Sequence, residues 1–441
     1  MILSLLALTL SLQTTQLPPA RDAATLRPTP KSPNIVFILA DDFGVNMVRA
    51  YGEASTPPCT PNIDGLAGEG LLFRNAWANP VCSPTRAAVL SGRYGFRTGV
   101  GTPGAGAVLD LSETTLPEVL AGYESACAGK WHLGGNNIDH PNQSGFDHYA
   151  GAIGGGLPDY GAWTKVTDGS ADMVTTYATT DTANEAIGMI QTMQEPWFMY
   201  VAFNAPHTPF HEPPTNLCPT PTCVDSYCGN LGPNPTNAEL AKAMAEAMDH
   251  EIGRFLTTLD GIDPNAMVIF MGDNGTARQA TEAPFIPTRA KGTPYEGGVN
   301  VPLIVRGPGV QQGECQGLVS PTDIFATVAD LAGVRVRGSS TVGQDGVSLV
   351  PYFSNPSASL RQTAYAEKFS PNGGSPPFAD HSRTVRNERY KLIRVTGEPD
   401  EFYDLQLDAF ENTNRLGIGL NAREQAAFDE LEGVLQTLGV D

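Results

Sequence analysis

The sequence predicts an α/β fold, with a large mixed, mostly parallel sheet flanked by helices and a smaller C-terminal α+β domain that contains an antiparallel sheet. Short apolar runs alternate with helical patterns over most of the chain, and this alternation is typical of a mostly parallel sheet. Several apolar runs are followed at once by polar residues. Because ligands bind beyond the carboxyl ends of the strands in open α/β sheets, we expect these polar residues to share one site.

The predicted strands are short apolar runs bounded by polar or turn-forming residues. They cover residues 34–40, 125–128, 197–205, 266–272 and 301–305. Between some of them, segments 182–194 and 237–259 carry apolar residues at helical spacing and are predicted to be helices.

The pattern changes toward the C-terminus. Residues 383–395 (RTVRNERYKLIRV) are predicted to form a hairpin that turns at Asn387-Glu388, and residues 422–439 are predicted to form a closing helix. We therefore place a main domain at residues 32–340 and the smaller α+β domain at residues 341–441.

The charge balance excludes polyanionic partners. The formal net charge is -20, from 27 Lys and Arg against 47 Asp and Glu. Such a chain repels nucleic acid and anionic membrane surfaces, so neither is expected as a partner. An anion that binds here must be held by a local basic pocket or by a metal ion.

The N-terminus predicts export. Residues 2–12 form an apolar run that is too short to span a bilayer but suits the apolar core of a signal peptide. We assign residues 1–20 as a signal peptide and expect the protein to be periplasmic or secreted. No other apolar run is long enough for a transmembrane helix.

The chain has 7 cysteines, and an odd count in an exported protein leaves one of them unpaired. Cys218, Cys223 and Cys228 cluster in a Pro- and Asn-rich stretch, which indicates a loop held by disulfides. A zinc site is disfavoured there because no histidine or fourth cysteine stands at ligand spacing. Without Cys82, six cysteines remain, enough for up to three disulfides.

Cys82 stands at the start of a short predicted helix. Pro84 suits the first turn of a helix, so Cys82 is expected close to the helix N-terminus. Helix N-termini bind anions and lower thiol pKa values, and Arg86 lies on the same helix face. The pattern therefore favours a nucleophile that faces an anion, although a buried structural cysteine is the commoner role of an isolated Cys.

The stretch C-S-P-T-R-x-x-x-L-S-G-R, from Cys82 to Arg93, resembles the signature of the sulfatase family. The resemblance extends over nearly the whole mature chain and includes the blocks NIVFILADD (34–42), GKWHLGG (129–135), FNAPHTPF (203–210), GDNG (272–275) and KGTPYEGG (291–298). It implies an alkaline phosphatase-like fold, an arylsulfatase-like hydrolase and a catalytic domain at residues 32–340.

The resemblance implies that Cys82 is a precursor. A formylglycine-generating enzyme reads the C-x-P-x-R core and oxidises the cysteine to 3-oxoalanine (formylglycine), whose hydrate is the nucleophile. One hydroxyl of the hydrate takes the sulfuryl group, and the second then expels sulfate and restores the aldehyde.

Two predicted strand ends supply oxygen ligands for a metal ion: Asp41 and Asp42 after one strand, Asp273 and Asn274 after another. Hard oxygen donors suit Ca²⁺ or Mg²⁺. The resemblance favours Ca²⁺, with residue 82 as a further ligand. The sequence Asn274-Gly-Thr276 also matches a glycosylation sequon, but a ligand at a strand end is expected to be buried.

The other site residues take their roles from the resemblance. Lys130 and Lys291 contact the sulfate, Arg86 holds the aldehyde hydrate, and His132 deprotonates the hydrate to release sulfate. His207 binds the sulfate and protonates the leaving oxygen. Histidine suits both proton transfers because its pKa lies near neutrality.

The expected substrate is a sulfate monoester of a small molecule or saccharide, such as a sulfated carbohydrate or an aryl sulfate. Residues 136–180, rich in Gly, Asp and Tyr, are expected to line the substrate pocket, and His211 is expected in a loop without a catalytic role. The alternative is a phosphonate or phosphate ester hydrolase on the same scaffold. A carbohydrate-binding protein without catalysis is disfavoured by the complete residue set, and a cysteine hydrolase leaves the acidic metal set unexplained.

Overall fold

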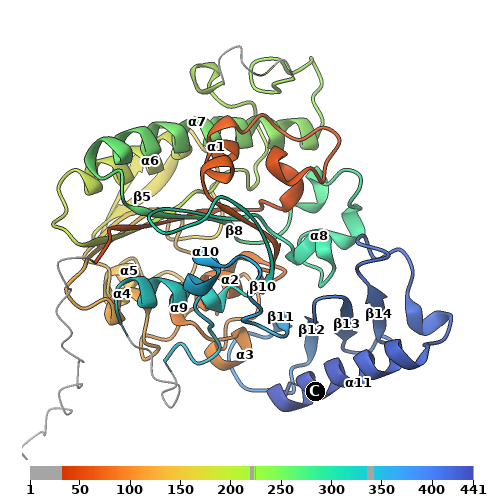
Figure 1. Ribbon diagram of the computed structural model, residues 1–441. Helices are drawn as coiled ribbons and strands as arrows, with labels where there is room; N and C mark the ends of the chain where they lie inside the picture. The colour runs from red at the N-terminus through yellow and green to blue at the C-terminus, as the bar shows by residue number, and fades with distance from the viewer. Residues whose placement is uncertain (1–31, 105, 219–222, 224, 335–341, 441) are drawn as a thin grey trace, which may run out of the picture.

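The computed structural model describes residues 32–104, 106–218, 223, 225–334 and 342–440. The predicted signal peptide lies outside the described residues. No helix in the described part of the chain combines the length and the apolar composition needed to cross a membrane. Figure 1 shows one large sheet covered by helices on both faces, with a second, smaller sheet beside it near the C-terminus.

The large sheet has ten strands, and its four central strands run parallel. In spatial order the strands are β10 (Gly313–Val319), β2 (Leu71–Ala76), β9 (Leu303–Arg306), β8 (Met267–Gly272), β1 (Ile35–Ala40), β7 (Trp197–Ala202), β3 (Glu124–Gly129), β4 (His148–Gly151), β5 (Trp163–Thr167) and β6 (Ser170–Val174). Strand β9 is antiparallel to both of its neighbours, and β5 and β6 form an antiparallel hairpin at one edge.

The central strands are apolar because both of their faces are covered. All residues of β1, β7 and β8 are buried, as expected for parallel strands between two helix layers. One layer contains α1 (Pro61–Glu69), α6 (Ala178–Ile190) and α7 (Asn237–Ile262). The other contains α2 (Cys82–Ser91), α4 (Leu116–Val119), α5 (His140–Gln143), α9 (Thr322–Leu331) and α10 (Val350–Ser354).

The remaining helices are short. Helices α3 (Gly95–Thr98) and α8 (Glu296–Val299) lie in connections, as do 3-10 helices at Val45–Met47, Arg49–Tyr51, Thr215–Leu217, Arg278–Ala280, Pro287–Arg289 and Arg415–Gly417.

The predicted strands and long helices are confirmed, with shifts at their ends. Helix α6 begins at Ala178, earlier than predicted, because its first turn is buried against the sheet and packing overrides the weak helix propensity of the threonines there. Helix α7 begins where the sequence predicts, because Thr236 and Glu239 form a capping box.

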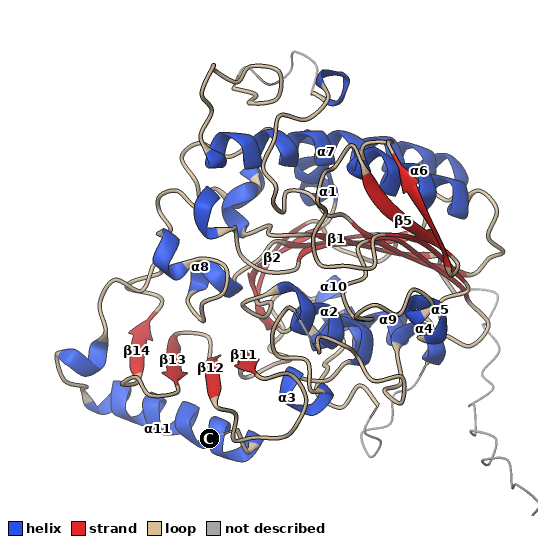
Figure 2. Cartoon of the chain, turned by 180° about the vertical axis from the view of Figure 1, so that it is seen from behind, coloured by secondary structure: helices blue, strands red, loops and turns tan. Residues whose placement is uncertain are grey.

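The C-terminal sheet is antiparallel and has the order β11 (Ala364–Ser370), β12 (Asp380–Arg386), β13 (Tyr390–Val395) and β14 (Glu401–Asp404). Figure 2 shows α11 (Ala422–Leu438) lying along this sheet. The hairpin of β12 and β13 turns where predicted, with Asn387 N donating to Tyr390 O at 3.0 Å. The predicted fold class is thereby confirmed, while the division between residues 340 and 341 stays a prediction.

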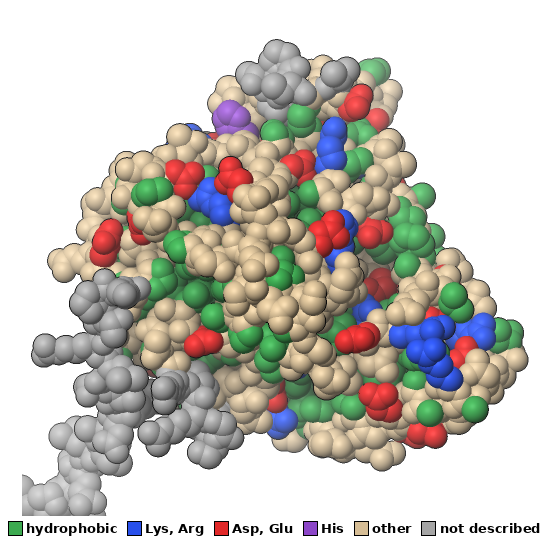
Figure 3. All heavy atoms as spheres, in the orientation of Figure 1, with side chains coloured by type: hydrophobic (Ala, Val, Ile, Leu, Met, Phe, Trp, Pro, Cys, Tyr) green, Lys and Arg blue, Asp and Glu red, His purple; other side chains and the backbone are tan. Residues whose placement is uncertain are grey.

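A buried charge cluster connects the C-terminal sheet to α8 and to Trp77, the residue that follows β2. Lys391 Nζ on β13 lies 2.9 Å from Glu296 Oε1 and 2.8 Å from Glu411 Oε1, and it sits 4.7 Å from the centre of the Trp77 ring. On the face drawn in Figure 3, Lys and Arg side chains gather at lower right, over the C-terminal sheet. The negative net charge is therefore unevenly spread over the molecule.

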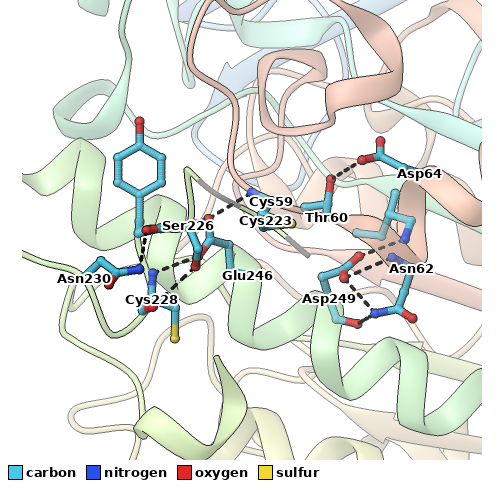
Figure 4. Close-up of a disulfide and its surroundings, with 12 residues drawn as sticks. Cys59, Thr60, Asn62, Asp64, Cys223, Ser226, Cys228, Asn230, Glu246 and Asp249 are labelled. Atoms are coloured by element: carbon cyan, nitrogen blue, oxygen red, sulfur yellow. Dashed lines mark hydrogen bonds between the residues drawn. A yellow bond between two sulfur atoms is a disulfide. The ribbon is translucent and has the colours of Figure 1, made fainter. Parts of the chain in front are cut away.

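Two disulfides hold the loop that precedes α7. They join Cys218 to Cys228 and Cys59 to Cys223, so the prediction of a disulfide-held loop is confirmed. The buried Glu246 carboxylate accepts hydrogen bonds from the backbone of Cys59 and Cys228 at 2.9 and 2.8 Å, which fastens the loop to α7 (Figure 4).

Of the up to three disulfides that six cysteines could form, two are present among the described residues. Cys127 and Cys315 are buried free thiols on β3 and β10. They serve as small apolar side chains in the core, which the parity of the cysteine count does not reveal.

Candidate active site

The predicted site residues meet at one edge of the large sheet. Asp41 and Asp42 follow β1, Asp273 and Asn274 follow β8, and Lys130 follows β3. These strands and β7, which leads toward His207, are neighbours and run parallel. Their carboxyl ends therefore bring together residues that lie far apart in the sequence.

Each of two lysines pairs with a carboxylate at this edge. Lys130 Nζ pairs with Asp41 Oδ2, and both side chains are fully buried. Lys291 Nζ pairs with Asp42 Oδ1, which also accepts a hydrogen bond from Asn274 Nδ2 at 2.9 Å. The backbone of Asp42 is held in the left-handed region at φ 60°, a conformation that costs energy for a non-glycine residue and persists only where the surroundings enforce it.

Arg86 is buried against Asp273. Its Nε and Nη2 lie 3.1 and 2.8 Å from Asp273 Oδ2, and its Nη1 donates to Lys130 O at 2.9 Å. Burial alone would lower the pKa of Arg86, but Asp273 outweighs it and holds that pKa above the ordinary value. Among the described residues, the hydrogen bonds of Arg86 run to these two partners and not to residue 82.

The oxygen donors fit a hard divalent cation. Asp41 Oδ1 and Asn274 Oδ1 are buried and have no hydrogen-bond partner among the described residues. A ligand atom from each of Asp41, Cys82 and Asp273 lies within 4.8 Å of the others. Buried oxygens without partners are costly, and a cation that takes oxygen ligands would satisfy them.

The carboxylates repel one another. Burial and the neighbouring Asp41 raise the pKa of Asp273 to about 7. Burial acts the same way on Asp41, but Lys130 and His207 outweigh it and hold its pKa below the ordinary value. A bound divalent cation would relieve this repulsion and favour both ionised carboxylates.

Cys82 begins α2, directly after Val81 in extended conformation. Its Sγ lies 3.3 Å from His132 Nδ1, and the side chain is 2% exposed. Burial raises the pKa of the Cys82 thiol despite the nearby Lys130 and Lys291. The expectation that the helix N-terminus lowers this pKa is therefore wrong, because desolvation outweighs it.

His132 and His207 flank the site. Burial, and then Lys130, hold the pKa of His132 well below its ordinary value, so its imidazole is neutral. His207 Nδ1 lies 2.9 Å from Thr208 O, and since a carbonyl only accepts, Nδ1 carries the proton and Nε2 remains available. Both histidines thus have geometry suited to proton transfer.

Two glycines that the sequence left unassigned shape this site. A Cβ on Gly155 would lie 2.2 Å from His132 Nε2, and a Cβ on Gly156 would lie 3.4 Å from His207 Cε1. The only sequence signal was the run of glycines at 154–156 within the predicted pocket segment. Asn274 is fully buried, in agreement with its exclusion as a glycosylation site.

Family models and relatives of known function point to the same protein family. A family model described as sulfatase matches residues 33–334, and one described as N-sulphoglucosamine sulphohydrolase, C-terminal, matches residues 290–435. The chain is 33% identical to N-acetylgalactosamine-6-sulfatase of Homo sapiens over 371 residues, covering 73% of this chain and 66% of that protein. It thus spans about two thirds of the length of that relative. It is 30% identical to arylsulfatase A of Homo sapiens, covering 88% of this chain and 84% of that protein.

Solved structures agree on the fold. A crystal structure described as Ps i-CgsB in complex with k-i-k-neocarrahexaose has a TM-score of 0.76 and 25% identity, covering 91% of this chain and 92% of that one. A structure described as BT4656 in complex with its substrate D-Glucosamine-2-N, 6-O-disulfate has a TM-score of 0.71 and 22% identity, covering 92% of this chain and 98% of that one.

Proposed function

The chain belongs to the sulfatase family, and we propose that it hydrolyses sulfate monoesters of saccharides or aryl alcohols with Cys82 oxidised to formylglycine. The observation that carries this proposal is the position of Cys82. It lies at a helix N-terminus, 3.3 Å from His132 Nδ1 and within 4.8 Å of two carboxylates that suit a metal ion. A buried thiol with a raised pKa is a poor nucleophile, which supports its conversion to another group.

The conversion has to precede folding. Cys82, Ser83, Pro84, Thr85 and Arg86 are all buried in the folded chain. A formylglycine-generating enzyme that reads these residues therefore acts on the chain before α2 packs against the sheet.

The hydrated aldehyde supplies one hydroxyl that takes the sulfuryl group and a second whose deprotonation releases sulfate. The first hydroxyl loses its proton as it attacks, and His207 acts as an imidazolium: Nδ1 keeps its hydrogen bond to Thr208 O, and Nε2 gives a proton to the ester oxygen as the alcohol leaves. His132, kept neutral by burial and by Lys130, accepts the proton of the second hydroxyl. One water restores the hydrate, so the sulfate ester anion and water become the alcohol, the sulfate dianion and one proton.

Lys130 and Lys291 offset the charge of the sulfate. Both are held at the site by ion pairs, to Asp41 and Asp42. In a chain with a net charge of -20, such fixed local cations are what allow a sulfate monoanion to bind. They also stabilise charge that develops on the sulfuryl oxygens during transfer.

Asp41, Asp42, Asp273, Asn274 and residue 82 would hold a divalent cation. We propose Ca²⁺, with Mg²⁺ as the alternative, because the donors are carboxylate and amide oxygens. The ion would supply a positive charge that attracts the sulfate and makes the hydrate more acidic.

We further propose that the protein is exported to the periplasm or secreted. The apolar run at residues 2–12 supports this, and so do the two disulfides, which are typical of oxidising compartments.

The test compares turnover of an aryl sulfate and an aryl phosphonate monoester that share one alcohol. We expect the sulfate to be hydrolysed with the higher kcat/KM, and the Cys82→Ala variant to lose this activity. A preference for the phosphonate would instead support the phosphonate or phosphate ester hydrolase.

A further inference from the structure

A cavity lies beside the segment that carries His207. It has a volume of about 720 Å³ and is lined by Pro158, Asp159, Tyr160, Gly161, Tyr177, Pro209, His211, Glu212, Pro213, Pro214 and Thr215. Tyr160 Oη lies 2.8 Å from the carbonyl oxygens of both Asn204 and His207. The wall of this cavity is therefore attached directly to the segment that carries His207.

The same loop forms both sites. Gly155 and Gly156 pass against His132 and His207, and the chain then continues through Pro158 to Gly161 into the cavity wall. On the other side, Pro209 lines the cavity two residues after His207. The cavity wall therefore continues from both segments that carry or contact His207.

Three aromatic rings pack together at the cavity wall, where His211 and Tyr177 are partly exposed and Tyr160 is buried. The His211 ring lies 4.6 Å from the Tyr160 ring and 5.6 Å from the Tyr177 ring, measured between centroids. His211 Nδ1 donates to Pro209 O at 2.8 Å, and its Nε2 lies within hydrogen-bond distance of Tyr177 Oη, at 2.9 Å. Both ring nitrogens are therefore engaged, which holds the His211 ring in one orientation.

The charges of the cavity are all negative. Asp159 and Glu212 are exposed carboxylates, and the lining contains no Lys or Arg. Lys165 on the adjacent strand β5 is paired with Asp181 and Glu185. The cavity thus offers aromatic faces and carboxylate acceptors, and it lacks a cation that would bind an anionic group.

We propose that this cavity binds an uncharged sugar ring next to the sulfated residue of a saccharide substrate; this inference rests on the proposed function. Aromatic faces pack against the apolar faces of a sugar ring, and Asp159 and Glu212 accept hydrogen bonds from its hydroxyl groups. A uronate or a second sulfate in the same place would face two carboxylates and be repelled. The substrate class is therefore sulfated saccharides in which a neutral hexose adjoins the reacting residue.

The test uses two disaccharide monosulfates with the same sulfated sugar, one joined to a neutral hexose and one to a hexuronic acid. We expect the neutral form to have a kcat/KM about tenfold higher, equivalent to roughly 1.4 kcal/mol. The Glu212→Lys variant should lower or invert the ratio of kcat/KM for the neutral substrate to kcat/KM for the uronate substrate. Asp429→Lys, an equal charge change at an exposed position on α11, should keep the wild-type ratio.

The outcomes separate the two proposals. The sugar site would be overturned if the neutral and the uronate disaccharide had nearly equal kcat/KM. It would also be overturned if the ratio of these two kcat/KM values were the same in the Glu212→Lys and Asp429→Lys variants. If the protein still hydrolysed an aryl sulfate, the sulfatase proposal would stand in either case. Absence of turnover with every sulfate ester, in protein whose Cys82 is converted, would overturn the proposed function itself.

A binding measurement needs no turnover. In the Cys82→Ala protein, we expect saturation transfer from the protein to the unsulfated neutral disaccharide, and its loss in a Cys82→Ala, His211→Ala double variant. Equal transfer in both proteins would contradict the assignment of the aromatic wall.

Discussion

Arg86 and Asp273 form a fully buried ion pair, with Arg86 Nη2 2.8 Å from Asp273 Oδ2. Arg86 also donates to the carbonyl of Lys130, so one side chain from α2 links the ends of β8 and β3. The pair therefore fixes the helix that carries Cys82 against β8, which precedes the proposed metal ligand Asp273, and against β3, which precedes Lys130.

Replacing Arg86 by Ala should lower the free energy of unfolding by about 3–5 kcal/mol, because it leaves the Asp273 carboxylate buried without its partner. Denaturant unfolding measures this. Arg93, near the end of the same helix, pairs with Glu113 where both side chains are partly exposed, so Arg93→Ala is the matched control and should cost clearly less. An equal loss of unfolding free energy in Arg86→Ala and Arg93→Ala would show that the buried pair has no special role in stability.

Gly155→Ala should reduce kcat on an aryl sulfate by more than about tenfold. The added methyl group would lie 2.2 Å from His132 Nε2 and displace the ring that is proposed to accept a proton during sulfate release. Gly154→Ala is the control, because the nearest atom to its Cβ would be 3.8 Å away. Steady-state kinetics of both variants, with melting temperatures to verify folding, test the prediction. The prediction fails if Gly155→Ala and Gly154→Ala have the same kcat.

His132 is proposed to act in sulfate release, after the alcohol has left, so its protonation affects kcat. The pH dependence of kcat should therefore lack an acid limb at the ordinary histidine value of 6.5 from His132, because burial and Lys130 hold its pKa far lower. A general base works in its neutral form, and a lowered pKa extends that form toward acid pH. The profile is measured with an aryl sulfate, which stays ionised throughout. An acid limb near pH 6.5 that disappears in the His132→Gln variant would contradict the lowered pKa of His132.

Removing divalent cations should lower the melting temperature and abolish turnover, and Ca²⁺ should restore both. Binding at 100 times Kd stabilises a fold by about 2.7 kcal/mol, and ligation would also relieve the repulsion between Asp41 and Asp273. In Asn274→Ala, which loses a buried oxygen without a partner, the shift of melting temperature with Ca²⁺ should shrink. A melting temperature that is independent of chelator and cation would argue against a metal site.

Much of this arrangement could be predicted from the sequence because parallel strands end at one edge. The apolar runs that end at Ala40 and Gly272 are predicted to be parallel strands of one sheet. Their carboxyl ends lie at the same edge, so Asp41 and Asp273, which follow them, come close together. The motif at Cys82 then placed the helix N-terminus correctly. These conclusions depend on local patterns and on one topological rule.

Other features depend on three-dimensional packing and could not be predicted. Cys59 pairs with Cys223 across a separation of 164 residues, and spacing alone carries no signal for such a partner. The raised pKa of the Cys82 thiol follows from complete burial, which no sequence pattern around the motif reports. Likewise, His211 lines a cavity only because Tyr160 and Tyr177, which lie far from it in the sequence, pack against its ring.

The central claim is that Cys82 is converted before the protein works, and the mass of one peptide tests it. Trypsin should release residues 75–86, which end at Arg86 and contain Cys82. In protein from a host that carries the modifying enzyme, we expect the mass of the formylglycine form and capture of the peptide by a hydrazide reagent. A peptide that instead carries a free thiol, alkylated by iodoacetamide in protein that is fully active, would contradict the account.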